Sequence, residues 1–377
     1  MAMERLFQLM QEKHASDMFL AAHSPVHLKI GGRLTPVNEQ ILTPEHIEAL
    51  LAQVASPAQM AELAATNELN MGVSLTGVGR FRLSAFRQRG SISAVFRYIP
   101  SDIPALSSLN LPPVLGQLIM EKRGLLLVVG STGSGKSTTI AAMLDHRNAS
   151  APGHILTLED PIEFLFKNQQ SIVNQREIGS DARDFSTALR NALRQAPDCI
   201  LIGEIRDREA MAAALAYAQS GHLVVATLHA NNSYNALNRI IGFYPIESRA
   251  ALLQDLSSTV NAIVSQRLVP ALSGGARAAA VEVMVNSRAI ADLIEKGDIG
   301  QIKEALDNSM SPGSQSFEQA LRKLVQDGVV GRDEALANAD SANNLLWQLN
   351  NGADGKAGEA AASPGAAASF TGFTLNQ

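Results

Sequence analysis

A glycine-rich segment that follows an apolar run carries the strongest chemical signal in the sequence. Residues 130–137 read Gly-Ser-Thr-Gly-Ser-Gly-Lys-Ser and match the pattern G-x-x-x-x-G-K-[ST] completely. The glycines let backbone N–H groups point inward at phosphate oxygens, and the helix that follows adds its partial positive charge. The pattern predicts a phosphate-binding loop for a nucleoside triphosphate, formed by Gly130, Ser131, Thr132, Gly133, Ser134, Gly135, Lys136, Ser137 and Thr138.

Two residues of this loop have specific expected roles. Lys136 should reach the β- and γ-phosphates, and the hydroxyl of Ser137 should bind Mg²⁺. The same motif occurs in kinases, GTPases, DNA translocases and motors. The class of reaction therefore depends on the residues that come later in the chain.

Carboxylates follow two later apolar segments. One segment ends in Glu159, Asp160 and Glu163, and the apolar residues 200–202 lead into Glu204 in the manner of a Walker B strand. Carboxylates at the end of a sheet strand suit the handling of Mg²⁺ and of an attacking water. For the first segment, taken alone, an acidic loop that caps a helix is the alternative.

Two histidines, His222 and His229, bracket a further apolar run, Leu-Val-Val-Ala-Thr-Leu. A single histidine at a strand end is usually structural. Two of them on one strand, in a sheet that already holds a phosphate loop, are candidates for sensing the γ-phosphate.

Strand and helix signals alternate from about residue 113 onward. Continuously apolar runs at residues 124–129, 154–158, 199–202 and 222–227 are typical of strands buried on both faces. This alternation predicts an α/β domain with a largely parallel sheet. Residues 287–340 are expected to be helical.

The first hundred residues mix helix and strand signals and predict a small α+β domain. Residues 26–30 alternate strictly and run into Gly31 and Gly32, which favour a hairpin turn. Thr43 and Pro44 have the types expected at a helix start. The predicted division of the chain is an N-terminal domain at 1–100, a linker at 101–113, an ATPase domain at 114–345 and a disordered Ala/Gly/Ser-rich tail at 346–377.

Composition excludes several classes of protein. The single cysteine, Cys199, excludes an intramolecular disulfide framework and a tetracysteine zinc site. With Lys plus Arg 31 and Asp plus Glu 36, the net charge is −5, which argues against nucleic acid as a partner. The start of the chain is not typical of a signal peptide, and no continuous apolar span of about 20 residues is present. The sequence therefore predicts an intracellular protein without an integral membrane segment.

The four motif segments together resemble the secretion-ATPase superfamily and, within it, the PilT and PilU family of type IV pilus retraction motors. They are the Walker A loop, the "Asp box" at 158–164, the Walker B segment at 203–206 and the "His box" from 221–222 to 228–229. The resemblance covers roughly residues 1–345. It implies a PAS-like N-terminal domain joined to a RecA-like P-loop ATPase domain with C-terminal helices.

Two differences from related motors indicate which group of the superfamily the chain resembles. Extension motors and type II secretion ATPases usually carry a tetracysteine subdomain and a longer N-terminal region, and this chain has neither. In PilT-type motors a C-terminal helix usually carries two arginines at positions where this chain has Ala291 and Glu295. That departure resembles PilU, and it leaves open whether the chain retracts pili alone or beside a PilT-like paralogue.

The resemblance also implies cofactors and roles. ATP and Mg²⁺ are the expected cofactors, with Ser137 and Glu204 on the Mg²⁺ side and either Glu163 or Glu204 handling the water; Glu163 is preferred as the base. Arginines of the N-terminal domain would complete the site when the domains close. The expected catalytic residues are Glu159, Glu163, Glu204, His222, His229, Arg82 and Arg97.

The function that the resemblance implies is an ATP-hydrolysing homohexameric motor of pilus retraction and twitching motility. Its further expected partner is the inner-membrane platform protein of the pilus, and its expected location is the bacterial cytoplasm, peripheral at the inner membrane. The alternatives are a pilus extension or type II secretion ATPase, and a nucleotide-gated accessory subunit that does not hydrolyse ATP. A DNA translocase is disfavoured because no basic groove signature is present.

Overall fold

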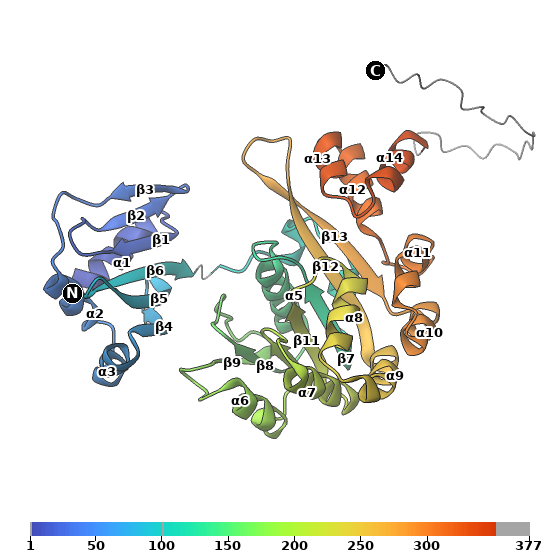
Figure 1. Ribbon diagram of the computed structural model, residues 1–377, viewed down its shortest axis with the longest axis horizontal. Coiled ribbons are helices and arrows are strands. Elements are labelled where there is room, and N and C mark those ends of the chain that lie inside the picture. Colours follow the sequence, from blue (N-terminus) through green and yellow to red (C-terminus); the bar gives the residue numbers. More distant parts are fainter. Residues whose placement is uncertain (1, 100–101, 352–377) are drawn as a thin grey trace, which may run out of the picture.

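The computed structural model describes residues 2–99 and 102–351, which form two sheets with helices packed on them (Figure 1). The first sheet has the strand order β3-β2-β1-β6-β5-β4 and the second has the order β13-β12-β7-β11-β10-β8-β9. This mixed architecture confirms the predicted α/β class. The PAS-like description of the first domain and the predicted boundaries between the first domain, the linker and the ATPase domain stay predictions.

The N-terminal sheet is antiparallel throughout. Its strands are β1 (Asp17–Leu20), β2 (His27–Ile30), β3 (Arg33–Pro36), β4 (Glu68–Leu75), β5 (Gly79–Gln88) and β6 (Ser91–Ile99), and its helices are α1 (Ala2–Glu12), α2 (Pro44–Leu51) and α3 (Pro57–Thr66).

Local signals of the sequence explain how these elements begin and turn. Gly31 and Gly32 have positive φ values of 54° and 81° in the β2–β3 turn, as the hairpin prediction requires. Thr43 caps α2 and Pro44 opens it, which confirms the predicted helix start. The ring of Phe7 stacks on that of Phe81 at a centroid distance of 4.0 Å and fixes α1 on the sheet.

The second sheet is parallel except for its last strand. Its strands are β7 (Gly124–Val129), β8 (Gly153–Glu159), β9 (Ser171–Glu177), β10 (Cys199–Ile202), β11 (Leu223–Leu228), β12 (Val260–Pro270) and β13 (Arg277–Val285). The helices around it are α4 (Val114–Leu118), α5 (Lys136–Ser150), α6 (Phe185–Ala192), α7 (Arg208–Gln219), α8 (Ser233–Gly242) and α9 (Arg249–Thr259).

The four apolar runs of the sequence form β7, β8, β10 and β11, which lie side by side in the centre of this sheet. Parallel neighbours place their carboxyl ends at one edge. The motif segments that follow these strands therefore meet there. β12 carries no clear strand signal in the sequence, because the polar residues Asn261, Ser265, Gln266 and Arg267 interrupt its apolar pattern.

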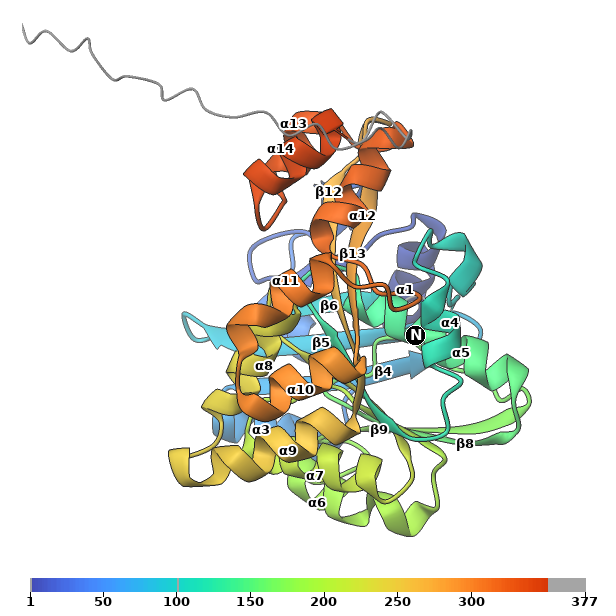
Figure 2. The same ribbon diagram turned by 90° about the vertical axis from the view of Figure 1, so that its right-hand side faces the viewer.

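The C-terminal helices lie along the β12–β13 hairpin (Figure 2). They are α10 (Arg288–Lys296), α11 (Ile302–Asp307), α12 (Phe317–Gln326), α13 (Arg332–Ala337) and α14 (Ala342–Asn351). Phe317 and Leu321 of α12 pack against Val269 of β12 and Ala280 of β13 in a shared core.

One predicted boundary needs correction. The disordered tail was expected from residue 346, but α14 continues to Asn351. It does so because Leu345 is fully buried and Leu349 packs on the same core. The rest of the predicted tail, residues 352–377, lies outside the described residues. Across residues 2–99 and 102–351, none of the helices has both the length and the apolar composition to cross a membrane.

Candidate active site

The phosphate loop, residues 130–138, runs from the end of β7 into the first turn of α5. Gly130 has a φ of +155°, and a Cβ built there would lie 2.6 Å from the carbonyl oxygen of Gln266. A Cβ on Gly135 would lie 2.7 Å from the Gln266 amide nitrogen Nε2. The Gln266 side chain also accepts a hydrogen bond from the Thr139 hydroxyl at 2.7 Å. Gln266 of β12 therefore supports the loop from below, and only glycine fits against it.

Lys136 lies over this loop. Its ammonium donates to the carbonyl oxygens of Gly130 and Ser131, both at 2.9 Å. Burial lowers the pKa of Lys136, and the negative charges of Glu204 and Glu163 oppose that shift. The two candidate carboxylates thus lie within electrostatic reach of the lysine, as the motifs predict.

The loop has the features that phosphate groups require. Gly133 has a φ of +77°, and a Cβ there would meet nothing within 4 Å, so the backbone faces open space. The hydroxyl of Ser134 is buried without a hydrogen-bond partner in the described structure. The N-terminus of α5 adds backbone N–H donors and a partial positive charge. These groups fit a nucleotide's phosphates.

Hard oxygen donors for Mg²⁺ are present but few. The Ser137 hydroxyl makes no hydrogen bond to any residue that the structure describes, and Glu204 stands nearby on β10's carboxyl side. The described ranges contain no group of three or more His, Cys, Asp or Glu side chains suited to a metal. This donor set fits a Mg²⁺ ion that keeps several waters and shares phosphate oxygens.

Glu204 has two partners, Arg206 of the same segment after β10 and His229 from the end of the neighbouring strand β11. Its oxygen Oε2 accepts from Nε and Nη2 of Arg206 at 2.8 Å, and Oε1 lies 3.4 Å from Nε2 of His229. Arg206 also lies 3.6 Å from Asp160 of the Asp box. The structure therefore joins side chains of the Asp box, Walker B and the second histidine, and Lys136 of Walker A lies within electrostatic reach of Glu204.

The two other predicted glutamates differ in their surroundings. Glu163 is exposed, and in the part of the chain that the structure describes its carboxylate has no hydrogen-bond or ion-pair partner. Glu159 is buried and accepts hydrogen bonds from Thr157 at 2.6 Å and from Gln175 at 3.2 Å. Burial raises the pKa of Glu159, and these hydrogen bonds oppose that shift. Glu159 thus holds the Asp box in place, whereas Glu163 is free to meet a water.

The structure does not bring His222, a candidate for sensing the γ-phosphate, to the phosphate loop of its own chain. His222 precedes β11, and its carbonyl accepts from the Gly124 N–H at the start of β7 at 3.1 Å. The phosphate loop follows the other end of β7, a strand of 6 residues that spans about 20 Å. The ring of His222 contacts the Tyr217 carbonyl instead, at 3.1 Å.

The predicted arginines lie opposite each other on the N-terminal sheet. Arg82 pairs with Arg97 in the β5–β6 register, and Arg97 donates to Asp17 at 2.8 Å. Both side chains are exposed, and among the described residues neither has a hydrogen bond or ion pair with the second domain. The structure does not bring Arg82 or Arg97 to the phosphate loop of their own chain.

Arg80, which lies on β5 like Arg82, contacts the second domain, and sequence reasoning missed it. Arg80 forms an ion pair with Glu177, the last residue of β9. A Cβ on Gly72 would lie 2.5 Å from Arg80 Nη2, so the glycine leaves the room that this pair needs. Strand alternation puts Arg80 and Arg82 on one face of the sheet. The sequence pattern alone therefore cannot tell which of the two contacts the second domain.

A pocket of about 370 Å³ lies beside the phosphate loop, between it and the segment that follows β11. Arg239 of α8 donates to the carbonyl oxygen of His229 at 2.9 Å and shapes one wall. The polar residues of α8 gave no signal beyond ordinary helix spacing. The pocket is lined by Gly130, Ser131, His229, Ala230, Asn231, Asn235 and Arg239.

The chain is similar to several known proteins. A family model described as "Type II/IV secretion system protein" matches residues 3–331. The type IV pilus ATPase PilU of Pseudomonas aeruginosa is 45% identical over 357 residues, which cover 95% of this chain and 94% of PilU. The type IV pilus retraction ATPase PilT of the same organism is 37% identical over 345 residues, which cover 92% of this chain and all of PilT.

A solved structure has the same fold. It is a crystal structure of the pilus retraction motor PilT with bound ADP, to which the chain is 38% identical. The match covers 91% of this chain and 99% of that one, with a TM-score of 0.85.

Proposed function

Because the chain belongs to the Type II/IV secretion system protein family, we propose that it is an ATP-hydrolysing motor that drives the retraction of type IV pili. The resemblance to retraction motors that the sequence predicted is confirmed, and PilU is among the similar relatives. One structural observation carries the proposal. Lys136, Glu163, Glu204 and His229 converge from separate strands at the edge where the phosphate loop lies.

ATP is the substrate that this site fits. The backbone of the phosphate loop and the ammonium of Lys136 would hold the phosphates, at the place where Lys136 now donates to loop carbonyls. When bound, Mg²⁺ supplies neutralisation of phosphate charge. Ser137 would hold it from the helix and Glu204 from the strand side, because both are oxygen donors beside the loop.

Glu163 is our preferred general base. Its free, exposed carboxylate can accept a proton from a water, whereas Glu204 is already held by Arg206 and His229. Glu204 then serves as the fixed charge of the site. His229 contacts Glu204 and lines the pocket beside the phosphate loop. It would report the state of the nucleotide to the rest of the chain.

A homohexamer is the assembly that we propose for the motor. Arg82 and Arg97 are exposed, and among the described residues neither contacts the phosphate loop of its own chain, so they could meet a neighbouring subunit; Arg97 also pairs with Asp17. In a ring they would complete the adjacent site, in the way that an arginine finger stabilises charge in other P-loop enzymes. Closure of the interface around nucleotide would be the force-generating step.

The partners and the location follow from this function as proposals. Ala291 and Glu295 stand on α10; Ala291 is half-buried, whereas Glu295, Asp292 and Lys296 are exposed. Since this face lacks the two arginines usual in PilT-type motors, we propose that the chain works beside a PilT-like paralogue on the inner-membrane platform protein. Its place would then be the cytoplasmic side of that membrane in a bacterium.

Two experiments test the proposal. The purified full chain should hydrolyse ATP only with Mg²⁺, and Lys136→Ala should abolish that activity. In the source bacterium, deletion of the gene should reduce pilus retraction in a strain that keeps its PilT-like gene. A chain that binds ATP without hydrolysing it in any assembly state would instead be a nucleotide-gated accessory subunit.

A further inference from the structure

Two neighbouring residues of β12 face opposite sides of the sheet and touch different parts of the molecule. Gln266 supports the phosphate loop, as described above, through Gly130, Gly135 and Thr139. Arg267 points the other way, because side chains alternate along a strand. It meets the loop at residues 229–232 and the C-terminal helices.

The guanidinium of Arg267 binds both of these segments at once. It donates to the carbonyl oxygen of Asn231 at 3.1 Å and to that of Asn338 at 2.6 Å. It also forms an ion pair with Asp340 and lies over the ring of Phe317, 3.9 Å from its centroid. The side chains of Arg267 and Asp340 are only 20% and 10% exposed. An ion pair this sheltered is screened much less than a surface pair.

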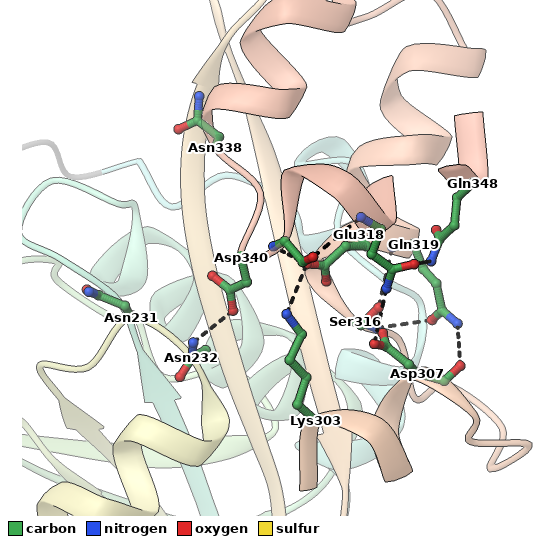
Figure 3. A network of polar contacts seen from close by, with 12 residues as sticks. Asn231, Asn232, Lys303, Asp307, Ser316, Glu318, Gln319, Asn338, Asp340 and Gln348 are labelled. Carbon is green, nitrogen blue, oxygen red and sulfur yellow. Dashed lines mark hydrogen bonds and ion pairs between the residues drawn. The ribbon is translucent and has the colours of Figure 1, made fainter. Parts of the chain in front are cut away.

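Asp340 closes the same contact from the other side. Its second oxygen accepts from the amide of Asn232 at 2.8 Å. Figure 3 shows this bond, with Asn231 and Asn232 of the loop on one side and Asn338 and Asp340 of the C-terminal region on the other. Asn232 is 2% exposed and caps α8 by accepting from the Asn235 N–H at 3.0 Å.

The 229–232 loop begins at the active site, with His229, and ends at Asn232, which is bonded to Asp340. His229 lies 3.4 Å from Glu204, and Asn231 lines the pocket beside Gly130. Three residues after His229, the chain is held by Asp340. The loop that carries His229 is therefore bonded to a carboxylate that lies between α13 and α14, more than a hundred residues later in the sequence.

We propose that Arg267 and Asp340 are positioning residues for ATP hydrolysis, through which the docked C-terminal helices hold His229 on Glu204. The inference rests on the proposed ATPase function. Neither residue lines the pocket or touches the phosphate loop. Their effect should therefore fall on turnover and leave nucleotide binding in place.

Asp340→Asn is the most informative substitution. It keeps the size of the side chain but removes the charge that pairs with Arg267, and it sets an amide against Asn232. We expect kcat to fall about tenfold while KM and the affinity for a fluorescent ATP analogue change by less than about twofold. Arg267→Lys keeps the charge but loses the planar guanidinium. Its kcat should lie between that of Asp340→Asn and that of the wild type.

A matched control comes from the same helices. Arg332 of α13 donates to Asn350 of α14 at 2.7 Å and does not touch the 229–232 loop. Arg332→Gln should keep wild-type kcat. Hydrogen exchange on the full chain adds a readout that does not need activity: Asp340→Asn should speed exchange at residues 229–232 and leave β7 protected.

The outcomes separate this inference from the proposed function. If the wild type hydrolyses ATP and Asp340→Asn has the same kcat and the same exchange at residues 229–232, the positioning role is wrong and the ATPase stands. If the wild type shows no hydrolysis, the proposed function fails. Faster exchange in the 229–232 loop of Asp340→Asn would then still support the inference that Arg267 and Asp340 position this loop. Unchanged exchange would refute that inference.

Discussion

Arg80 of β5 and Glu177 of β9 form an ion pair between the N-terminal sheet and the ATPase domain. Their side chains are 14% and 3% exposed, so the pair is largely removed from water. Glu177 also accepts a hydrogen bond from the backbone of Ile162 at 3.1 Å, directly before Glu163. A change in the contact between the domains can therefore reach the segment that carries the preferred base.

The first prediction concerns this pair. Arg80→Ala should lower the thermal unfolding midpoint and reduce ATP turnover, because it leaves the buried carboxylate of Glu177 without its cation. Loss of one partner from a buried pair typically costs about 3–5 kcal/mol. Differential scanning calorimetry and steady-state kinetics measure both effects. Arg82→Ala, on the same face of β5, is the matched control for stability; equal midpoints for the two variants would contradict the prediction.

The second prediction separates the two histidines. His229→Ala should lower kcat because His229 contacts Glu204, whereas His222→Ala should leave kcat close to that of the wild type because His222 lies at the opposite sheet edge. Both variants should be assayed in the same assembly state, confirmed by light scattering. A large loss of activity in His222→Ala would show that the residue acts from a neighbouring subunit or through the fold.

The third prediction concerns assembly. Arg82→Ala and Arg97→Ala should reduce turnover only where subunits are in contact, since neither side chain reaches the phosphate loop of its own chain. Light scattering should give a homohexamer for the wild type in the presence of nucleotide. Mixing Arg82→Ala subunits with Lys136→Ala subunits should restore part of the activity, because some interfaces then combine an intact Arg82 with an intact Lys136. No recovery in hexamers shown to be mixed would count against completion of a site by a neighbour.

The fourth prediction concerns Glu282 of β13, which is 4% exposed. Burial raises its pKa from 4.5 to about 7, with the charge of Asp340 acting in the same direction. The hydrogen bonds from the Ser233 N–H at 2.7 Å and the Ser265 hydroxyl at 3.0 Å act against this shift. In the folded chain the carboxyl therefore holds its proton at a pH where the unfolded chain has already lost it.

The raised pKa of Glu282 makes the stability of the fold depend on pH. The raised pKa contributes stability that is complete below pH 4.5 and is lost as the pH rises through about 7. Glu282→Gln cannot ionise, so its thermal midpoint relative to that of the wild type should increase between about pH 5 and about pH 8, by an amount equivalent to at most about 3 kcal/mol. A midpoint difference that stays constant over this range would mean that Glu282 is ionised to the same extent in the folded and the unfolded chain, so that its pKa is not raised.

Much of the site could be predicted because four buried strands carry an unbroken apolar signal. The runs that form β7, β8, β10 and β11 place their following residues at one edge, which is why Lys136, Glu163, Glu204 and His229 meet. The same logic places His222 away from the phosphate loop of its own chain. Two residues that bracket one strand stand at opposite edges of the sheet, and the apolar run between them already shows this.

The remaining contacts depend on the arrangement of whole elements. Gln266 and Arg267 lie in β12, whose polar residues hide the strand pattern although they are the ones that hold the phosphate loop and the C-terminal helices. Arg80 and Arg82 lie on the same face of β5. Arg80, and not Arg82, pairs with Glu177 because of where β9 lies. Asp340 follows a helix far along the chain, and no local pattern links it to Asn232.

The measurement that tests the central claim most directly is steady-state ATP hydrolysis by the purified full chain, with and without Mg²⁺, beside Lys136→Ala and Glu163→Gln. The account predicts Mg²⁺-dependent turnover in the wild type, no turnover and weakened nucleotide binding in Lys136→Ala, and a loss of kcat of about a hundredfold or more with retained ATP binding in Glu163→Gln. Wild-type activity in either variant, or a wild-type hexamer that binds ATP and never hydrolyses it, would contradict the account.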